Sequence, residues 1–258
     1  MIFETHAHYD DRAFDKDRVD LLKSLPENGI GAVVNAGSSL SSIETIRELT
    51  KQYSYVYGAV GIHPCDTGDL TEERFAWLKK QCADEKIVAV GEIGLDYHWN
   101  DPHPEIQKTW FVRQLLMAQE VHLPVIIHSR EAANDTLTIM RENHAERSGG
   151  VIHCFSYSVE MAAEFLKMDY YFGIGGVVTF ENAKKLKEAV RYIPTERILL
   201  ETDSPYLAPA PYRGKRNSSL YLPYIAEEIG RIKGMTAAEV IRCTEENAVR
   251  LFGVTCVC

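Results

Sequence analysis

The chain has 258 residues, of which 45% are hydrophobic and 25% charged, a composition that predicts a globular protein with a sizeable core. Its net charge of −9 excludes the broad basic surface that supports non-specific nucleic-acid binding, so a polyanion would need a local cationic site. The six cysteines show no regular close pairing, which argues against a disulfide framework. No apolar run reaches the 18 or so residues of a membrane span, and the sequence starts with a strand-like segment, so we expect a cytoplasmic protein.

Short apolar runs alternate with amphipathic segments of helical length along the whole sequence. Eight of these runs predict strands, at residues 2–8, 32–36, 56–62, 87–93, 124–128, 151–155, 170–174 and 198–203. Apolar residues three or four positions apart predict helices between and after them, for example at residues 15–24, 41–52, 72–83, 104–120, 159–167 and 235–252. Residues 254–258 predict a frayed tail.

This alternation indicates parallel strands joined by right-handed crossovers, and eight such units in about 250 residues suit a closed (β/α)8 TIM barrel. An open doubly wound sheet is the competing α/β architecture. The first turn after a strand, residues 7–11, lacks the glycine-rich phosphate loop of that architecture. No linker or charge block divides the sequence, so we predict that residues 1–258 form a single domain.

Histidines and carboxylates stand at or just beyond the C-terminal ends of six predicted strands. These residues are His6, His8, His63, Glu92, His128, His153 and Asp203. In a (β/α)8 barrel these strand ends meet on the face that carries active sites. His6 and His8, two positions apart on a strand, point to the same side. A single histidine of this kind is more often structural, but the whole set suits two divalent cations that share one carboxylate.

The segment from Glu201 to Pro205 follows the apolar run of the last predicted strand. Alternation along the strand places Glu201 and Asp203 on one face, with Asp203 nearer the mouth of the barrel. A carboxylate beside an activated water can take its proton, so Asp203 is the candidate general base. Glu201 either orients a metal ligand from behind or is a hydrogen-bonded strand carboxylate.

A cationic loop follows the last predicted strand, where Arg213, Lys215 and Arg216 surround one glycine. Loops in this position of the fold often bind phosphate. Arg130, close after His128, would stand on the same rim, and a guanidinium matches phosphate oxygens bidentately. The alternative is a solvated basic loop, but its place beside the predicted ligands favours a substrate-binding role.

Several short motifs, taken together and in this order, resemble the TatD-type metal-dependent deoxyribonucleases, and the resemblance is close to the bacterial YabD-like subgroup. They are Phe3-Glu4-Thr5-His6-Ala7-His8, Gly61-Ile62-His63-Pro64, Gly91-Glu92-Ile93-Gly94-Leu95-Asp96-Tyr97, Pro124-Val125-Ile126-Ile127-His128-Ser129-Arg130, His153-Cys154-Phe155-Ser156 and Glu201-Thr202-Asp203-Ser204-Pro205. The resemblance extends from residue 2 to about residue 253. It implies a (β/α)8 barrel of the amidohydrolase superfamily with two divalent metal ions, such as Mg, Mn or Zn.

The resemblance also implies roles for the individual residues. By motif position, one ion would be held by His6, His8, Glu92 and Asp203, and the other by Glu92, His128 and His153, with Glu92 as the bridge. Asp203 and Glu92 would be catalytic. His63 would contact a substrate phosphate.

The implied activity is hydrolysis of phosphodiester bonds in DNA, as a 3′ to 5′ exonuclease. The acidic net charge favours end-on binding of a short single strand, with Tyr9, Tyr97, Trp99 and Tyr206 as candidates for base stacking or for packing. The resemblance also implies a monomer. A hydrolase of the same fold with another substrate is the main alternative: a D-aminoacyl-tRNA deacylase, or a small phosphoester, amide or lactone hydrolase. A non-catalytic metal-binding protein is disfavoured, because every expected ligand is present.

Overall fold

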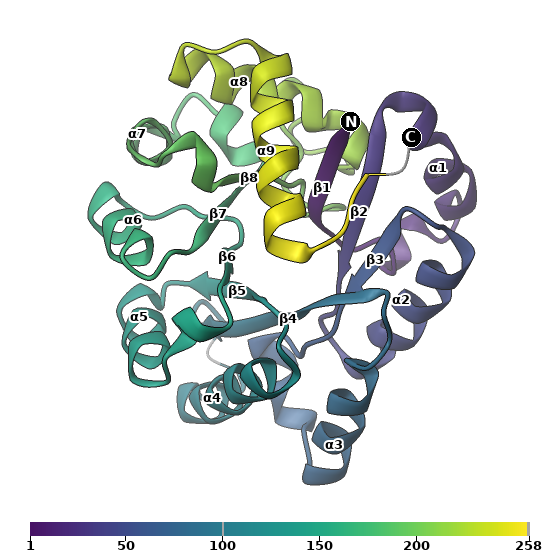
Figure 1. Cartoon of the computed structure of the whole chain (residues 1–258), viewed down its shortest axis with the longest axis vertical. Coiled ribbons are helices and arrows are strands. Elements are labelled where there is room, and N and C mark those ends of the chain that lie inside the picture. The colour runs from purple at the N-terminus through teal and green to yellow at the C-terminus, as the bar shows by residue number, and fades with distance from the viewer. Residues whose placement is uncertain (100, 257–258) are drawn as a thin grey trace.

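A computed structural model describes residues 1–99 and 101–256. Eight parallel strands form one sheet in chain order, and helices surround them (Figure 1). The strands are β1 (Ile2–Ala7), β2 (Ile30–Ala36), β3 (Val56–Ala59), β4 (Ile87–Asp96), β5 (Val125–Arg130), β6 (Gly150–Ile152), β7 (Tyr171–Ile174) and β8 (Ile198–Leu200). Ala7 pairs with Ser204, and the Asp203 N–H donates to the carbonyl oxygen of His6 at 2.9 Å, which joins the last strand to the first. The predicted barrel is confirmed.

The helices follow the strands and cover the outside of the barrel. They are α1 (Arg18–Ser24), α2 (Leu40–Gln52), α3 (Glu72–Gln81), α4 (Pro104–Val121), α5 (Ala133–Glu142), α6 (Val159–Leu166), α7 (Lys184–Tyr192), α8 (Leu222–Lys233) and α9 (Ala237–Phe252). Capping boxes at Ser39 and Thr236 begin α2 and α9, and Gly253 ends α9 in a left-handed conformation. These end signals explain why the predicted helices agree closely with the observed ones. None of the helices in the described residues is long and apolar enough to span a membrane.

The barrel interior is filled by side chains beneath the mouth. β1, β2 and β4 are buried along their whole length, as expected for parallel strands between an outer layer of helices and a packed interior. Phe252 of α9 covers the bottom, with its ring centroid 5.9 Å from that of Phe3. Val254 and Cys256 pack against the same cluster, so this part of the predicted frayed tail lies against the fold, whereas residues 257 and 258 lie outside the described residues.

Six strands end at other positions than predicted, and the differences in β4, β6 and β8 shape the mouth of the barrel most. β6 and β8 stop before His153 and Glu201, because Cys154 and Asp203 adopt left-handed conformations with φ of 46° and 57°. β4 instead continues to Asp96. Some residues at the mouth therefore stand on turns and not on strands. The longer β4 also carries a second carboxylate besides Glu92, that of Asp96, which lies beyond the end of the predicted strand.

Two glycines allow backbone and side chains to approach closely beneath the mouth. Gly94 has φ of 145°, and a Cβ atom there would collide with the carbonyl oxygen of His128. A Cβ atom on Gly173 would collide with the carboxylate of Glu201. Glycine at both positions therefore brings β4 against β5 and leaves space for a buried carboxylate under the centre.

Candidate metal centre

Four donor atoms lie close together in the mouth, from His6 on β1, His8 just after it, Glu92 on β4 and Asp203 after β8. The Nε2 atoms of His6 and His8 are 3.1 Å apart. Glu92 Oε2 lies 3.4 Å from His6 Nε2 and 3.6 Å from His8 Nε2, and Asp203 Oδ1 lies 3.7 and 3.4 Å from the same two atoms. A tetrahedral ion with bonds of about 2.1 Å would separate its ligands by about 3.4 Å. We call this set the four-donor group.

The other oxygen of Glu92 faces a second set of ligands. Glu92 Oε1 lies 2.6 Å from His128 Nδ1 and 3.1 Å from His153 Nε2. The Nε2 atom of His63 is farther away, at 3.9 Å. We call Glu92 Oε1, His128 and His153 the three-donor group. The bridging arrangement expected for Glu92 is compatible with this geometry, because its two oxygens face different groups.

Two of the four histidines in these groups are oriented by a hydrogen bond on the far side of the ring: His8 Nδ1 bonds to the carbonyl oxygen of Ala36 at 3.0 Å, and His128 Nε2 to Asp96 Oδ2 at 3.2 Å. His153 Nδ1 lies 3.3 Å from Glu201 Oε1, an ion-pair contact without hydrogen-bond geometry. A carbonyl or an ionised carboxylate only accepts, so the far nitrogen of His8 and of His128 carries the hydrogen. In a neutral ring the nitrogen that faces the centre then presents a lone pair, as a metal ligand requires.

Asp96 is a residue of this site to which the sequence motifs assigned no role. It is buried at the end of β4, and its Oδ1 accepts the backbone N–H of His98 at 2.9 Å. The signal that could have identified it is its even spacing from Glu92, four positions along the same strand. The sequence predicts a strand that ends at residue 93 and so leaves Asp96 outside it, whereas β4 extends to Asp96.

Glu4 is a second carboxylate without an assigned role, and it lies deeper in the barrel. Its Oε1 accepts the N–H groups of His6 and Thr202 at 3.3 and 2.8 Å, and its Oε2 accepts the hydroxyls of Thr202 and Ser219 at 2.6 and 2.8 Å. Burial raises the pKa of Glu4 to about 8, although these hydrogen bonds act in the opposite direction. Glu4 thus links the backbone beside His6 to the backbone beside Asp203.

The charges at the centre are buried and close together, so each shifts the pKa of its neighbours. Burial alone would raise the pKa of Glu92, but the charges of His153 and His128 lower it well below its usual value. Burial lowers the pKa of His8, but the hydrogen bond and charge of Asp203 outweigh that effect and raise it to about 9. Protonated histidines therefore offset the carboxylates, and divalent cations in the same positions would do so with a matching donor set. The residues present fit two ions.

His63 faces the centre as a neutral hydrogen-bond donor. Its Nδ1 accepts the backbone N–H of Cys65 at 3.2 Å, which places the ring hydrogen on Nε2. Burial, together with the charge of His128, lowers the pKa of His63 to about 3. This geometry suits the predicted contact with a phosphate oxygen.

The predicted cationic residues differ in their availability to a substrate. Arg216 donates to both carboxylate oxygens of Asp17, at 2.7 and 2.6 Å, and packs over the ring of Phe14. This exposed ion pair makes Arg216 less available to a substrate than an unpaired guanidinium, and its substrate-binding role remains a prediction. Arg213 lies over the ring of Phe180, and the exposed Lys215 has no ion pair among the described residues. Arg213, Lys215 and Arg130 also remain candidates.

The four aromatic candidates also separate into two classes. Tyr9 is fully buried, and its hydroxyl bonds to that of Ser219 at 2.7 Å, so it is a packing residue. Tyr97 is partly buried and donates to Asp135 at 2.7 Å. Trp99 and Tyr206 are exposed, and only these two present large free ring surfaces.

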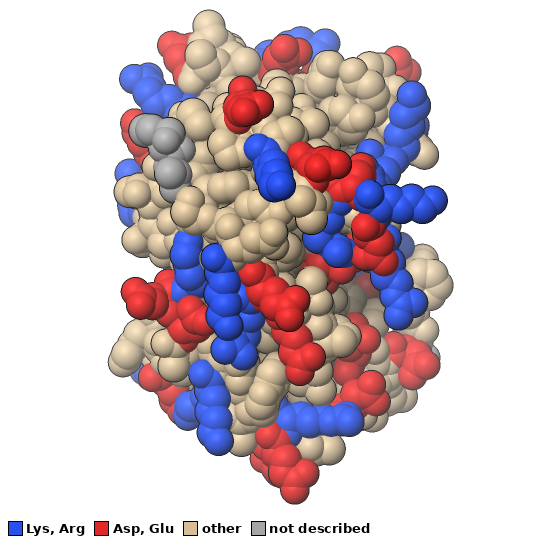
Figure 2. Space-filling view, turned by 90° about the vertical axis from the view of Figure 1, so that its right-hand side faces the viewer, with Lys and Arg blue, Asp and Glu red and all other residues tan. Residues whose placement is uncertain are grey.

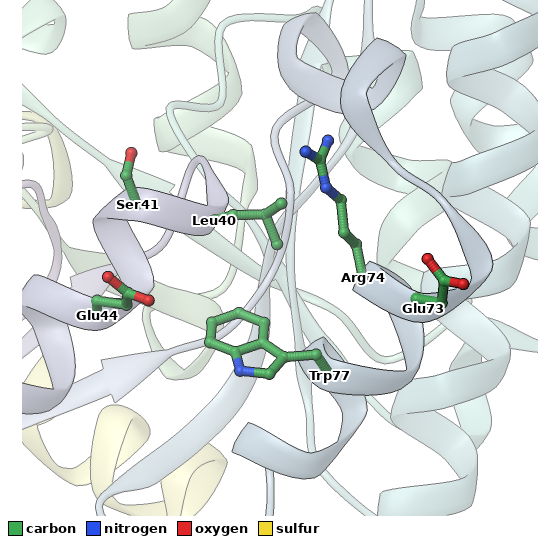
Figure 3. A pocket seen from close by; sticks show the side chains of 6 residues that line it. All are labelled: Leu40, Ser41, Glu44, Glu73, Arg74 and Trp77. Atoms are coloured by element: carbon green, nitrogen blue, oxygen red, sulfur yellow. The ribbon is translucent and has the colours of Figure 1, made fainter.

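A cleft of about 460 Å³ lies outside the barrel, between α2 and α3 (Figure 3). Leu40, Ser41 and Glu44 of α2 face Glu73, Arg74 and Trp77 of α3 across it. It contains no predicted ligand, and it carries two carboxylates for one guanidinium. A second cleft, of about 430 Å³, borders the ends of β4 and β5 and is lined in part by Tyr97 and Tyr157.

Comparisons with known proteins agree with this geometry. The family model described as TatD related DNase matches residues 3–253. The chain is 46% identical to the uncharacterized metal-dependent hydrolase YabD of Bacillus subtilis over 254 residues, which cover 98% of this chain and 100% of that protein. It is 33% identical to the 3′-5′ ssDNA/RNA exonuclease TatD of Shigella flexneri, with 98% and 99% of the two chains covered. The crystal structure of YJJV, a TatD homolog from Escherichia coli, superimposes with a TM-score of 0.92 at 28% identity and 98% coverage of both chains. The chain therefore belongs to the TatD-related DNase family of metal-dependent hydrolases.

Proposed function

We propose that this protein is a two-metal hydrolase that cleaves phosphodiester bonds at the 3′ end of single-stranded DNA. The observation that carries the proposal is the position of Glu92, whose two oxygens each face a separate group of histidines in the mouth of the barrel. His6, His8, Glu92 and Asp203 would hold one ion, and Glu92, His128 and His153 the other. Two divalent cations would lower the pKa of a water and stabilise the charge of an in-line displacement.

The protein's own side chains account for the proton and for the substrate's orientation. Burial alone would raise the pKa of Asp203, but the hydrogen bond with His8 and the charge of His153 lower it, so the carboxylate is ionised and accepts a proton. Asp203 is also more exposed than Glu92, with 16% against 4% of the side chain accessible, and so is open to water. His63 would donate its Nε2 hydrogen to a phosphoryl oxygen, and Arg130 would neutralise phosphate at the rim.

The protein's net charge and the name of one relative support the end of a DNA strand as the substrate. One relative, from Shigella flexneri, bears the name of a 3′-5′ exonuclease of single-stranded DNA and RNA. The face with α1, α2 and α3 shows basic and acidic side chains interspersed, without a wide basic area for gripping long duplex (Figure 2). The chain's net charge of −9 therefore restricts phosphate binding to a few side chains at the mouth.

The test is metal-dependent hydrolysis of a short end-labelled single strand. We expect the strand to shorten stepwise from its 3′ end, with activity lost on chelation, restored by added divalent metal and lost again in Asp203→Asn. A Glu44→Gln variant, altered at an exposed carboxylate in the cleft between α2 and α3, serves as the control and should retain activity. An intact strand alongside rapid turnover of a neutral ester would reject the nuclease function and keep the hydrolase.

A hydrolase of a small ester or phosphoester is the second candidate. It is favoured by the pairing of Arg216 with Asp17, which leaves fewer cations for a polyanion than the sequence indicates. Replacement of Arg213 and Lys215 by glutamine distinguishes the two functions. Such a change should strongly reduce phosphodiester turnover but leave the turnover of a neutral ester nearly unchanged.

A further inference from the structure

We propose that Trp99 and Arg130 form a docking platform, on which a base and a phosphate of single-stranded nucleic acid bind just outside the metal centre. The inference rests on the proposed function, because it assigns a binding mode to the same substrate class. It concerns how the strand is held and not how it is cleaved, so the two can be tested separately.

Trp99 stands on the rim beside the three-donor group. It follows Asp96 by three residues, and Asp96 contacts the ring of His128. Its side chain is 64% exposed, whereas Trp77 is partly buried and Trp110 almost fully buried. A single exposed aromatic residue is common on protein surfaces. Its position within a few residues of the centre gives this one its significance.

Arg130 lies on the same rim, two residues after His128. Its guanidinium carbon is 5.9 Å from the centroid of the Trp99 ring. Its charge also acts on the thiol of Cys65, which follows β3, two strands away from β5 in the barrel. Among the described residues no carboxylate pairs with Arg130, in contrast to Arg216, which is paired with Asp17. The guanidinium is therefore available to an anion.

The chemistry of this pair defines the ligand. An indole face stacks on any base, and a guanidinium matches phosphate oxygens bidentately. Bases in a duplex are already stacked on their neighbours, so an exposed ring competes for them poorly. The pair therefore suits an unpaired strand with little preference for sequence, with the phosphate between Arg130 and His63 and a base on Trp99.

Tryptophan fluorescence tests the platform without turnover. The metal-loaded protein would be titrated with a short oligodeoxyadenylate in which phosphorothioate linkages resist hydrolysis. We expect the strand to quench fluorescence in the unsubstituted protein and in Trp77→Phe, but not in Trp99→Phe. Trp77 is the matched control, because it lies in the outer cleft between α2 and α3 (Figure 3). Quenching that persists in Trp99→Phe and disappears in Trp77→Phe would place the strand in that cleft and overturn the platform.

Affinity measurements complete the test. Trp99→Ala should weaken binding of the labelled strand about tenfold or more, and Trp99→Phe much less, because phenylalanine keeps a stacking surface. Arg130→Gln should lower the slope of log affinity against log salt by about 1. Unchanged affinity in Trp99→Ala would overturn the platform. Cleavage of an ordinary strand without a Trp99 signal would reject the platform alone, whereas a Trp99 signal without cleavage would reject the nuclease function alone.

Discussion

The two halves of the metal centre share Glu92 but differ in how completely they enclose an ion. In the four-donor group, the ring nitrogens of His6 and His8 are 3.1 Å apart and lie 3.4 to 3.7 Å from carboxylate oxygens of Glu92 and Asp203. The three-donor group has Glu92 Oε1 and two histidines, and the Nε2 atom of His63, which is 3.9 Å from that oxygen, lies near enough to Glu92 and His128 to serve as a further donor. Structural metal sites are closed, and catalytic ones keep an open position. We therefore expect substrate oxygen to enter on the three-donor side, where Arg130 also stands.

The strongest test of this comparison is removal of the shared carboxylate. Glu92→Gln removes one charge and weakens a ligand oxygen in both groups at once, so we expect fewer than two bound ions per chain. Phosphodiester turnover should fall on the order of 10⁴-fold, the scale on which essential catalytic side chains act. Elemental analysis and a turnover assay measure these effects. Glu44→Gln, in the outer cleft, is the control, and two tightly bound ions in Glu92→Gln would refute the sharing.

Graded chelation separates the two halves. The group with fewer donors should release its ion first, so metal loss should occur in two steps as chelator is added. His153→Asn should move only the early step, and Asp203→Asn mainly the late one. A single step, or an early step that responds only to Asp203→Asn, would contradict the assignment of a weaker three-donor side.

Substitution of Asp96 tests whether its carboxylate, by orienting His128, strengthens metal binding by the three-donor group. Asp96→Asn removes the charged acceptor that holds His128 Nε2, and we expect affinity for the early-released ion to fall about 10- to 100-fold. Isothermal titration with metal measures this without turnover. Asp135→Asn, a more exposed carboxylate nearby, should leave the affinity unchanged. If Asp96→Asn and Asp135→Asn bind this ion with equal affinity, His128 needs no charged partner to bind it.

The last prediction concerns folding stability and the support beneath the four-donor side, where Glu4 is buried with a pKa raised to about 8. Its unfolded value is about 4.5, so the folded state holds this proton more tightly, and the resulting stability is lost as pH rises through 8. Glu4→Gln cannot titrate. Relative to the unsubstituted protein, the variant should therefore gain up to about 1.4 kcal/mol per pH unit between pH 5 and 8. Denaturant unfolding of the chelated proteins measures the difference, and a pH-independent difference would refute the raised pKa.

Much of the fold was predictable, because periodicity is a local property of the chain. The prediction of parallel strands in chain order is confirmed, and the helices agree closely. The predicted ends of β6 and β8 were wrong, because left-handed residues such as Cys154 and Asp203 leave no mark in an apolar pattern. The structure also gathers the ligand residues expected at the mouth. Their roles as ligands remain a prediction.

By itself the sequence determined which residue types stand at the strand ends, since that depends only on the spacing of apolar and polar residues. Only the tertiary structure decided which nitrogen of each histidine faces inward, because the orienting partners come from distant segments, such as Ala36 for His8. It likewise decided that Arg216 binds Asp17 across 199 positions and that Glu4 bonds to Thr202 across 198. Such pairings depend on how strands and loops pack around the barrel, which no local pattern encodes.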